Sequence, residues 1–256
     1  MSSLNSQFLT IGEHHAPYDA IDPATTLKGS CAGKVVFITG ASRGIGRAVA
    51  LAFAQAGAKA MYLTARSEQA LAQVKAAVAA AYPDTQCGAM VSDVTKADDV
   101  QAAVDDCVSR FGAIDVVDAN AGYLGPWLKI AESDPVSWWK TWEVNVKGVY
   151  LVARYCLPHL INSARAHAGK GATGGHLILM SSVGAQLLLP GASDYQTSKH
   201  AINRLCEFIH ADHGEEGVKC FALHPGGVDT QLARNMPEHI HQYLTDAPEL
   251  AAGFIV

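Results

Sequence analysis

Short apolar runs alternate with amphipathic, alanine-rich stretches along most of the chain. The apolar runs have the length and composition of buried strands, and the stretches between them repeat their apolar residues with helical spacing. In the first half, the sequence predicts strands at 34–39, 58–64, 86–91 and 114–119, and helices at 44–56, 68–81 and 97–110. Such alternation is typical of βαβ units, which build a parallel sheet through right-handed crossovers.

The second half continues the pattern with longer helices. The sequence predicts a helix from Pro135 to His167, a strand at 175–181, a helix at 194–213 and a strand at 218–223. We therefore predict a single doubly wound α/β domain over 34–256. Residues 1–33 show no sustained periodicity and are expected to be an extension that lies on the domain.

Length, charge and cysteine usage narrow the class of function. The chain has 256 residues, of which 49% are hydrophobic, so it is long enough to bury one substantial core. Its formal net charge is −5 without long basic runs, which argues against nucleic acid or an anionic membrane as partner. The six cysteines are scattered without a paired spacing, as in a reduced intracellular protein. The N-terminus does not resemble a signal peptide, and no apolar stretch reaches the roughly 20 residues that span a membrane. We therefore expect a cytoplasmic enzyme with a small-molecule partner.

A glycine-rich loop follows the first predicted strand and opens the first predicted helix. It places Gly40, Gly44 and Gly46 in the pattern Gly-x-x-x-Gly-x-Gly. Glycines allow a tight turn and a close approach of the backbone to a pyrophosphate, whose charge then meets the free N–H groups of the helix start. The competing interpretation is a plain strand-to-helix turn, but the position between a strand and a helix favours phosphate binding.

A tyrosine and a lysine four residues apart begin the helix predicted at 194–213. Tyr195 and Lys199 share one helix face, so an ammonium lies beside a phenol and is expected to lower the phenol pKa from about 10 towards neutrality. Ser182 lies thirteen residues before Tyr195, at the end of a predicted strand. These groups suit proton transfer, although each taken singly is more often a surface or strand-end residue.

Together, the glycine loop and the Tyr195-x-x-x-Lys199 pair resemble the short-chain dehydrogenase/reductase family. The resemblance covers about 34–256 and implies a Rossmann-type parallel sheet of order 3-2-1-4-5-6, whose usual seventh strand has no counterpart here. It implies homodimers or homotetramers formed through the helices at 135–167 and 194–213. It also implies a nicotinamide dinucleotide held by Gly40, Ser42, Arg43, Gly44, Ile45 and Gly46.

The same resemblance assigns four catalytic residues. Tyr195 donates a proton to a carbonyl oxygen or removes one from an alcohol, and Lys199 lowers the tyrosine pKa and binds the nicotinamide ribose. Ser182 hydrogen-bonds the reacting oxygen, and Asn145 keeps a water near Lys199 as part of a proton relay. The cofactor supplies the hydride.

The end of the second predicted strand bears on which dinucleotide binds. An acidic residue there would bind the adenosine ribose hydroxyls and repel a 2′-phosphate. This chain instead has Arg66 and Ser67 at that point and Arg43 in the glycine loop, so guanidinium groups are available for a phosphate. We therefore expect NADP(H) rather than NAD(H), unless both arginines are ordinary surface charges.

Further cofactor contacts follow from the resemblance. Asp93 and Val94 correspond to a pair that contacts adenine, although a carboxylate at this place also serves as a helix cap. The remaining expected contacts are Asn120, Ala121 and Gly122 after the fourth strand, where Ala119 departs from the family pattern, and Pro225, Gly226, Val228 and Thr230 after the sixth.

Ligands of open α/β sheets bind beyond the carboxyl ends of the strands. The segments expected there are 123–127, 184–194 and 232–245, and the first two carry Leu124, Trp127, Leu187, Leu188 and Leu189. A bulky apolar ketone or secondary alcohol fits such walls. No metal site is predicted, because His239 and His241 have no third ligand beside them.

Two alternatives to this function stay open. The fold and its chemistry also suit an NAD-dependent alcohol dehydrogenase that works in the oxidative direction. The same domain would also suit a protein that binds a dinucleotide without redox turnover, as a regulator or as an isomerase or cyclase. The intact set of Ser182, Tyr195 and Lys199 argues against this second alternative.

Overall fold

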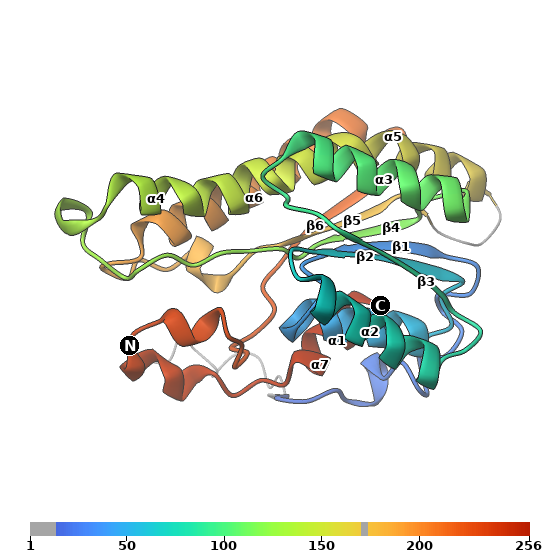
Figure 1. Ribbon diagram of the computed structural model, residues 1–256, viewed down its shortest axis with the longest axis horizontal. Helices are drawn as coiled ribbons and strands as arrows, with labels where there is room; N and C mark the ends of the chain where they lie inside the picture. The colour runs from blue at the N-terminus through green and yellow to red at the C-terminus, as the bar shows by residue number, and fades with distance from the viewer. Residues whose placement is uncertain (1–13, 170–173) are drawn as a thin grey trace, which may run out of the picture.

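Six parallel strands form the centre of the computed structural model, which describes residues 14–169 and 174–256 (Figure 1). The strands are β1 (Val35–Thr39), β2 (Ala60–Ala65), β3 (Gln86–Val91), β4 (Val116–Ala119), β5 (His176–Met180) and β6 (Lys219–Leu223). Their order is β3-β2-β1-β4-β5-β6, which confirms the predicted order. In register, Val36 of β1 lies beside Met61 of β2 and Val116 of β4. The strand order reverses between β1 and β4, and ligands of such sheets bind at that point.

Helices cover both faces of the sheet (Figure 1). One face carries α3 (Ala97–Phe111), α4 (Pro135–Trp142), α5 (Val149–His167) and α6 (Ser193–His213), and the other carries α1 (Gly44–Gln55), α2 (Glu68–Ala81) and α7 (Pro248–Ile255). Side chains alternate along a strand, so those of β1 point to both faces of the sheet. Val35 and Phe37 pack in the core on the side of α3, α5 and α6, and Val36 and Ile38 pack in the core on the side of α1, α2 and α7. All residues of β1 are therefore buried, as expected for a central parallel strand.

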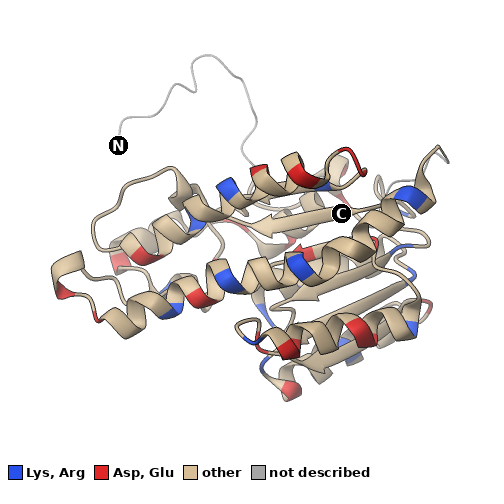
Figure 2. Ribbon diagram, turned by 90° about the horizontal axis from the view of Figure 1, so that it is seen from above, with Lys and Arg blue, Asp and Glu red and all other residues tan. Residues whose placement is uncertain are grey.

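Charged side chains of both signs are spread over the helices. Figure 2 shows acidic and basic residues interspersed along them, in keeping with the modest net charge of −5. Within residues 14–169 and 174–256, no helix combines the length and the apolar character needed to span a membrane.

The helix predicted from 135 to 167 is present, and its middle is a π-helical turn. This turn, Glu143–Gly148, joins α4 to α5 without a break, and the sequence did not indicate it. A π turn shifts the helix face, and here Asn145 lies in the interior with no exposed surface. Gly148 ends the turn against Val94, since a Cβ atom at position 148 would lie 2.8 Å from Val94 Cγ2.

Part of the expected N-terminal extension packs on the domain. Residues 14–33 contain a short 3₁₀ helix, Asp19–Ile21, and cover α7: a Cβ atom at Gly253 would lie 2.4 Å from the carbonyl oxygen of Ile21. Cys31 N donates to the carbonyl oxygen of Ala56, just after α1, at 3.2 Å. These contacts place the segment on the α1 and α7 side of the sheet. Residues 1–13 of the extension lie outside the described residues.

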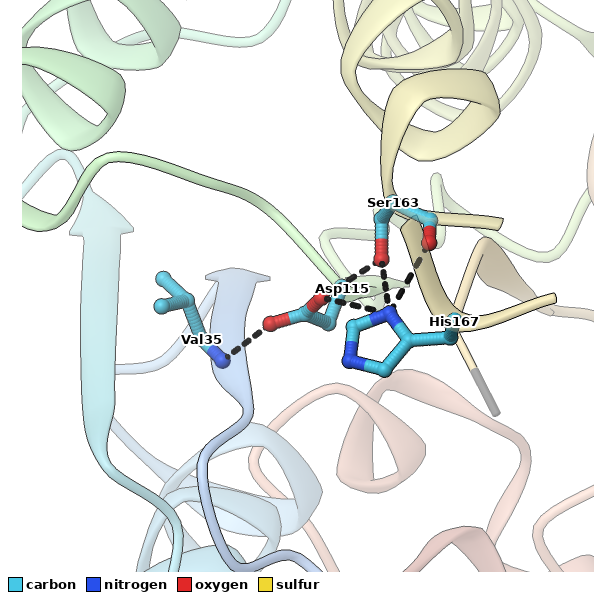
Figure 3. A network of polar contacts seen from close by, with 4 residues as sticks. All are labelled: Val35, Asp115, Ser163 and His167. Atoms are coloured by element: carbon cyan, nitrogen blue, oxygen red, sulfur yellow. Dashed lines mark hydrogen bonds and ion pairs between the residues drawn. The ribbon is translucent and has the colours of Figure 1, made fainter. Parts of the chain in front are cut away.

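A polar network joins β1, β4 and α5 (Figure 3). Asp115 immediately precedes β4, and its Oδ2 accepts a hydrogen bond from Val35 N at 2.8 Å. Its Oδ1 accepts from Ser163 Oγ, and His167 Nδ1 lies 2.8 Å from Ser163 O and 3.8 Å from Asp115 Oδ1. The buried serine hydroxyl lies closer to the carboxylate than to the imidazole. The cluster therefore fastens the amino ends of β1 and β4 to α5 and is not arranged as a nucleophile with its base.

One carboxyl group is buried in the centre of the sheet. Asp118 lies on β4 between Ile38 of β1 and Ile178 of β5, and its exposed fraction is zero. Among the described residues, neither of its carboxyl oxygens has a hydrogen-bond partner. Burial raises the pKa of Asp118 to about 8, because the ionised form loses its hydration in an apolar interior. Asp118 is therefore mostly protonated in the folded protein at neutral pH.

Asp118 should make the folded protein less stable as the pH rises. Its folded pKa lies above the value of about 4 of an unfolded chain, so the folded state holds the proton more tightly between the two values. Asp118→Asn removes this ionisation and should raise the free energy of unfolding by roughly 2–4 kcal/mol more at pH 8 than at pH 5 in urea denaturation. Asp105→Asn, at an exposed site on α3, is the control. An effect of Asp118→Asn that is equal at both pH values would contradict the assignment.

Candidate active site

The glycine loop lies between β1 and α1, packed against the chain that follows β4. Gly40 has a φ of +65°, and a Cβ atom there would lie 2.9 Å from Ala121 Cα. A Cβ atom at Gly46 would lie 2.6 Å from the carbonyl oxygen of Gly40. Both positions therefore require glycine, the first for its backbone conformation and both for their close contacts.

Asn120 holds this loop in place. Its Nδ2 donates to the carbonyl oxygens of Thr39 at 2.9 Å and Gly40 at 3.3 Å, and Ala121 N donates to Thr39 Oγ1 at 3.1 Å. At the start of α1, Arg43 occupies the cap position and makes no side-chain capping hydrogen bond. The N–H groups of the first turn are therefore available to an anion. Within the loop and this turn, Ser42 and Ile45 are partly buried, and after β4 Gly122 is exposed.

The two arginines expected to bind phosphate differ in their surroundings. Arg66 follows β2 and lines a cavity of about 450 Å³ together with Asp93. Arg43 Nη1 instead donates to Gln231 Oε1, so its guanidinium is held by the segment after β6. Of the two guanidinium groups, Arg66 is the one that faces an open site.

Asp93 and Ser67 are both engaged by neighbours in their own loops. Ser67 Oγ accepts from Ala70 N at 3.3 Å and caps α2. Asp93 Oδ1 accepts from Thr95 N at 3.0 Å and from Thr95 Oγ1 at 2.8 Å. Partial burial of Asp93 opposes its ionisation, but the hydrogen bonds from Thr95 and the nearby charge of Arg66 hold the pKa of Asp93 below its usual value. Asp93 therefore presents a charged carboxylate beside the cavity and closes a turn before α3 rather than capping that helix.

Ser182, Tyr195 and Lys199 come together at the carboxyl end of β5 and the start of α6. Tyr195 and Lys199 are 8% and 3% exposed. Ser182 Oγ accepts from Gly184 N at 3.0 Å. A Cβ atom at Gly184 would lie 3.3 Å from Ser182 Oγ and 3.7 Å from Tyr195 Cε1, so the hydroxyl and the ring flank the same glycine. Lys199 Nζ lies 5.6 Å from the centre of the Tyr195 ring and donates to Met180 O at 2.6 Å. Tyr195 and Lys199 are thus buried, and the partly buried Ser182 lies beside them.

Burial shifts the pKa values of two groups in this cluster. Burial raises the pKa of Tyr195, and the nearby Ser182 hydroxyl offsets this only in part. Burial also lowers the pKa of Lys199 to about 8. The amine lies over the ring of Tyr195 and binds Met180 O. Its charge therefore does not stabilise the phenolate enough to offset the hydration that the phenolate loses on burial. The role of Lys199 in lowering the phenol pKa, which the resemblance assigns together with the positive charge of the nicotinamide, stays a prediction.

Asn145 links this cluster to the loop after β4. Its Oδ1 accepts from Tyr123 N at 2.8 Å, and its Nδ2 donates to Tyr123 O at 2.9 Å and to Ser198 Oγ at 3.0 Å. Ser198 in turn donates to Tyr195 O at 2.7 Å. The amide therefore positions α6 relative to the loop, a contact that the sequence did not indicate. Its part in a proton relay through Lys199 stays a prediction.

Contacts between α4 and α6 also fix the helix that carries Tyr195, and sequence reasoning missed them. Thr141 Oγ1 donates to Asp194 Oδ2 at 2.5 Å, and both residues are buried. Trp138 Nε1 donates to Ser193 Oγ at 3.1 Å. The available signal was the pattern Trp-Trp-x-x-Trp in the first half of the long helix, which groups indole N–H donors on one helix face.

The segment after β6 packs against the glycine loop. A Cβ atom at Gly44 would lie 3.3 Å from Thr230 Cγ2, and Thr230 Oγ1 accepts from Ala233 N at 3.2 Å. Val228 is 4% exposed, and the turn before it contains Gly226 with a φ of +93°. The expected cofactor contacts after β6 therefore lie at the same edge of the sheet as the glycine loop.

The apolar segments expected around a substrate are only partly available to one. Trp127 Nε1 donates to Pro190 O at 2.7 Å, so the segments after β4 and β5 meet. Leu124, however, is 2% exposed and packs in the interior, whereas Leu188 is 94% exposed. Leu124 is therefore a core residue, and its assignment to a pocket wall is wrong.

Comparison with known proteins identifies the family. The family described as short chain dehydrogenase matches residues 34–241. The chain belongs to the short-chain dehydrogenase family. The short chain dehydrogenase mpl6 of Monascus purpureus is 43% identical to this short-chain dehydrogenase over 246 residues, which are 95% of this chain and 80% of that protein.

Solved structures share the fold of this short-chain dehydrogenase. An alcohol dehydrogenase from the archaeon Thermococcus sibiricus, complexed with 5-hydroxy-NADP, is 30% identical with a TM-score of 0.75, over 87% of this chain and 88% of that one. The 3-ketoacyl-(acyl-carrier-protein) reductase from Brucella melitensis, complexed with NADH, is 26% identical with a TM-score of 0.77, over 87% and 88% of the two chains. The protein is thus an oxidoreductase by family.

Asn145→Ala should destabilise this short-chain dehydrogenase by roughly 2–4 kcal/mol, because it leaves Tyr123 N, Tyr123 O and Ser198 Oγ without this partner in the interior. Chemical denaturation followed by tryptophan fluorescence measures the change. Asn162→Ala, at an exposed position on α5, is the matched control and should leave the stability nearly unchanged. Equal effects of the two substitutions would show that the Asn145 amide does not act as a buried link.

Proposed function

We propose that this short-chain dehydrogenase is an NADP(H)-dependent oxidoreductase that transfers a hydride between nicotinamide and a bulky apolar ketone or secondary alcohol. The observation that carries the proposal is the cluster of the partly buried Ser182 with the buried Tyr195 and Lys199, at the same sheet edge as the glycine loop. Carbonyl reduction needs a group that transfers a proton and a site for the dinucleotide, and this edge offers both.

The residues around the glycine loop fit a dinucleotide. The tight contacts at Gly40 and Gly46 expose backbone rather than side chains, beside the uncapped start of α1. We assign the pyrophosphate to this loop, the adenosine to the cavity lined by Arg66, and the nicotinamide to the side of Val228 and Thr230. When bound, the dinucleotide supplies or accepts the hydride.

Tyr195 is the proposed general acid and base. Its raised pKa keeps the phenol protonated at neutral pH, which suits donation of a proton to a carbonyl oxygen. Ser182, which lies beside Gly184 together with the Tyr195 ring, is assigned to the reacting oxygen. Lys199 has a pKa of about 8, so it changes its charge close to neutral pH and suits a role in resupplying the proton. The proposed direction at neutral pH is therefore reduction.

Arg66 supports NADP(H) as the preferred dinucleotide. It follows the end of β2, where a carboxylate would repel a 2′-phosphate, and it lines the cavity assigned to adenosine. A guanidinium binds such a phosphate through charge-assisted hydrogen bonds. The solved structures named above contain an NADP derivative in one case and NADH in the other, so their likeness does not favour either cofactor.

Exposed aromatic side chains support self-association. Trp139 on α4, Tyr150 on α5 and Phe208 on α6 are 57%, 50% and 59% exposed. Large apolar side chains on a surface are typical of protein interfaces. We propose a homodimer or homotetramer formed through these helices.

Tyr195→Phe should abolish turnover while cofactor binding is retained. Oxidation of NADPH with a panel of apolar ketones measures turnover, and kcat should fall by about 10²–10⁴-fold because the proton donor is lost. The dissociation constant for NADPH, measured by fluorescence titration, should stay close to that of the unaltered enzyme.

Tyr82→Phe is the matched control for this test, since Tyr82 lies at the end of α2, outside the proposed site. It should keep the unaltered rate. Retained turnover in Tyr195→Phe would refute the acid assignment. Failure of the unaltered enzyme to bind NADPH or NADH would refute the proposed function itself.

Arg66→Asp should reverse the preference between the two dinucleotides. Calorimetry should show NADPH binding weakened by about 10–100-fold, because a charge-assisted bond to the 2′-phosphate is replaced by repulsion. NADH binding should be unchanged or tighter. Lys75→Asp, at an exposed site on α2, changes the net charge equally and should leave the ratio of the two affinities as it is. The same ratio in Arg66→Asp and the unaltered enzyme would rule out Arg66 as the determinant.

A further inference from the structure

The proposed function leaves residues 14–33 without a role, although they reach the segment that packs against the glycine loop. We call residues 14–33 the N-terminal strap. His15 O accepts from Ala247 N at 2.7 Å, and His15 Nδ1 lies 2.6 Å from Asp246 Oδ1. The strap is thus joined, through both backbone and side chain, to the residues just before α7.

Asp246 binds the strap with one carboxyl oxygen and the segment after β6 with the other. Its Oδ2 accepts from Gly227 N at 2.6 Å, and its backbone N donates to Gly227 O at 2.9 Å. A Cβ atom at Gly226 would lie 2.4 Å from the same Oδ2, so the carboxylate sits directly on the turn. The Asp246 side chain is 15% exposed and that of His15 is 56% exposed, so water competes more strongly for the histidine.

The chain from Gly227 onward leads directly to the glycine loop. Three residues later, Thr230 Cγ2 lies 3.3 Å from the place that a Cβ atom of Gly44 would take. The next residue, Gln231, accepts a hydrogen bond from Arg43. A displacement of Gly227 would therefore move the groups that face the glycine loop.

On the side of the strap and α7, packing leaves the start of this segment partly open. A cavity of about 300 Å³ separates the start of the segment from the strap and α7, and its lining includes His14, Tyr18, Pro225, Gly226 and Phe254. An unfilled space offers no dispersion contacts to the chain beside it. Gly227 is packed on its other side, where a Cβ atom would lie 2.1 Å from Tyr243 O, so on the open side the Asp246 carboxylate is the contact that holds the turn.

We propose that Asp246, oriented by His15 of the strap, positions the segment after β6 for the nicotinamide half of the dinucleotide. The inference rests on the proposed function, which assigns that half to Val228 and Thr230. His15 and Asp246 are positioning residues, because they contact the segment and not the reacting atoms. The adenosine half is assigned to the cavity at Arg66, which other elements form. Its binding should therefore not depend on the contact between His15 and Asp246.

The test compares binding of NADPH with binding of 2′,5′-ADP, which contains only the adenosine half. Asp246→Ala should weaken NADPH binding by about 5–10-fold, and His15→Ala by about 2–4-fold, since the histidine is the more exposed partner. Both variants should bind 2′,5′-ADP like the unaltered enzyme. Titration calorimetry measures both ligands.

Further variants separate positioning from a loss of folding. Asp246→Asn keeps an oxygen that accepts from the segment after β6 and should retain most of the NADPH affinity. Asp22→Ala removes a strap carboxylate whose hydrogen bonds, from Ala24 N and Thr25 Oγ1, are local, and it should change neither affinity. The double variant His15→Ala/Asp246→Ala should bind NADPH no more weakly than Asp246→Ala, because His15 acts through that carboxylate.

The outcomes distinguish this inference from the function on which it rests. Equal losses for NADPH and 2′,5′-ADP would indicate general destabilisation and overturn the inference. Unchanged NADPH binding in both single variants would also overturn it. Failure of the unaltered enzyme to bind either ligand would overturn the proposed function and the inference with it. Binding of NADH and ADP in their place would refute only the NADP preference, and the comparison would then use that pair.

Discussion

The contact between the glycine loop and the chain after β4 is the constraint on which the rest of the site depends. Asn120 donates to two carbonyl groups of this turn, and a side chain at Gly40 would collide with Ala121. Because β1 and β4 are neighbours at the point where the strand order reverses, the contact joins the two halves of the sheet. The glycine loop therefore lies at the edge of the sheet where Ser182 follows β5 and Tyr195 lies at the start of α6.

Burial governs the electrostatics of the interior. It raises the pKa of Tyr195 and of Asp118, and it lowers the pKa of Lys199. In each case the uncharged form is favoured, because an apolar interior replaces hydration that only the charged form needs strongly. At Tyr195 the effect preserves a proton donor, which suits the proposed reduction. At Asp118 it leaves a neutral acid within the central sheet.

The proposed site is supported from both faces of the sheet. On one face, α4 holds α6 through the hydrogen bond between Thr141 and Asp194, and Asn145 links α6 to the loop after β4. On the other, Asp246 connects the N-terminal strap with the segment after β6. The groups that touch the ligands are thus few, whereas the contacts that orient them extend through much of the described chain.

The alternation of strands and helices and the glycine loop could be read from the sequence alone, because each depends on residues close together in the chain. The spacing of Tyr195 and Lys199 is local in the same sense. The π turn that buries Asn145, the interior position of Leu124 and the direction of the Tyr195 pKa shift could not be read in this way. Only the tertiary structure decided these features, because burial and hydrogen-bond partners depend on which distant segments pack together.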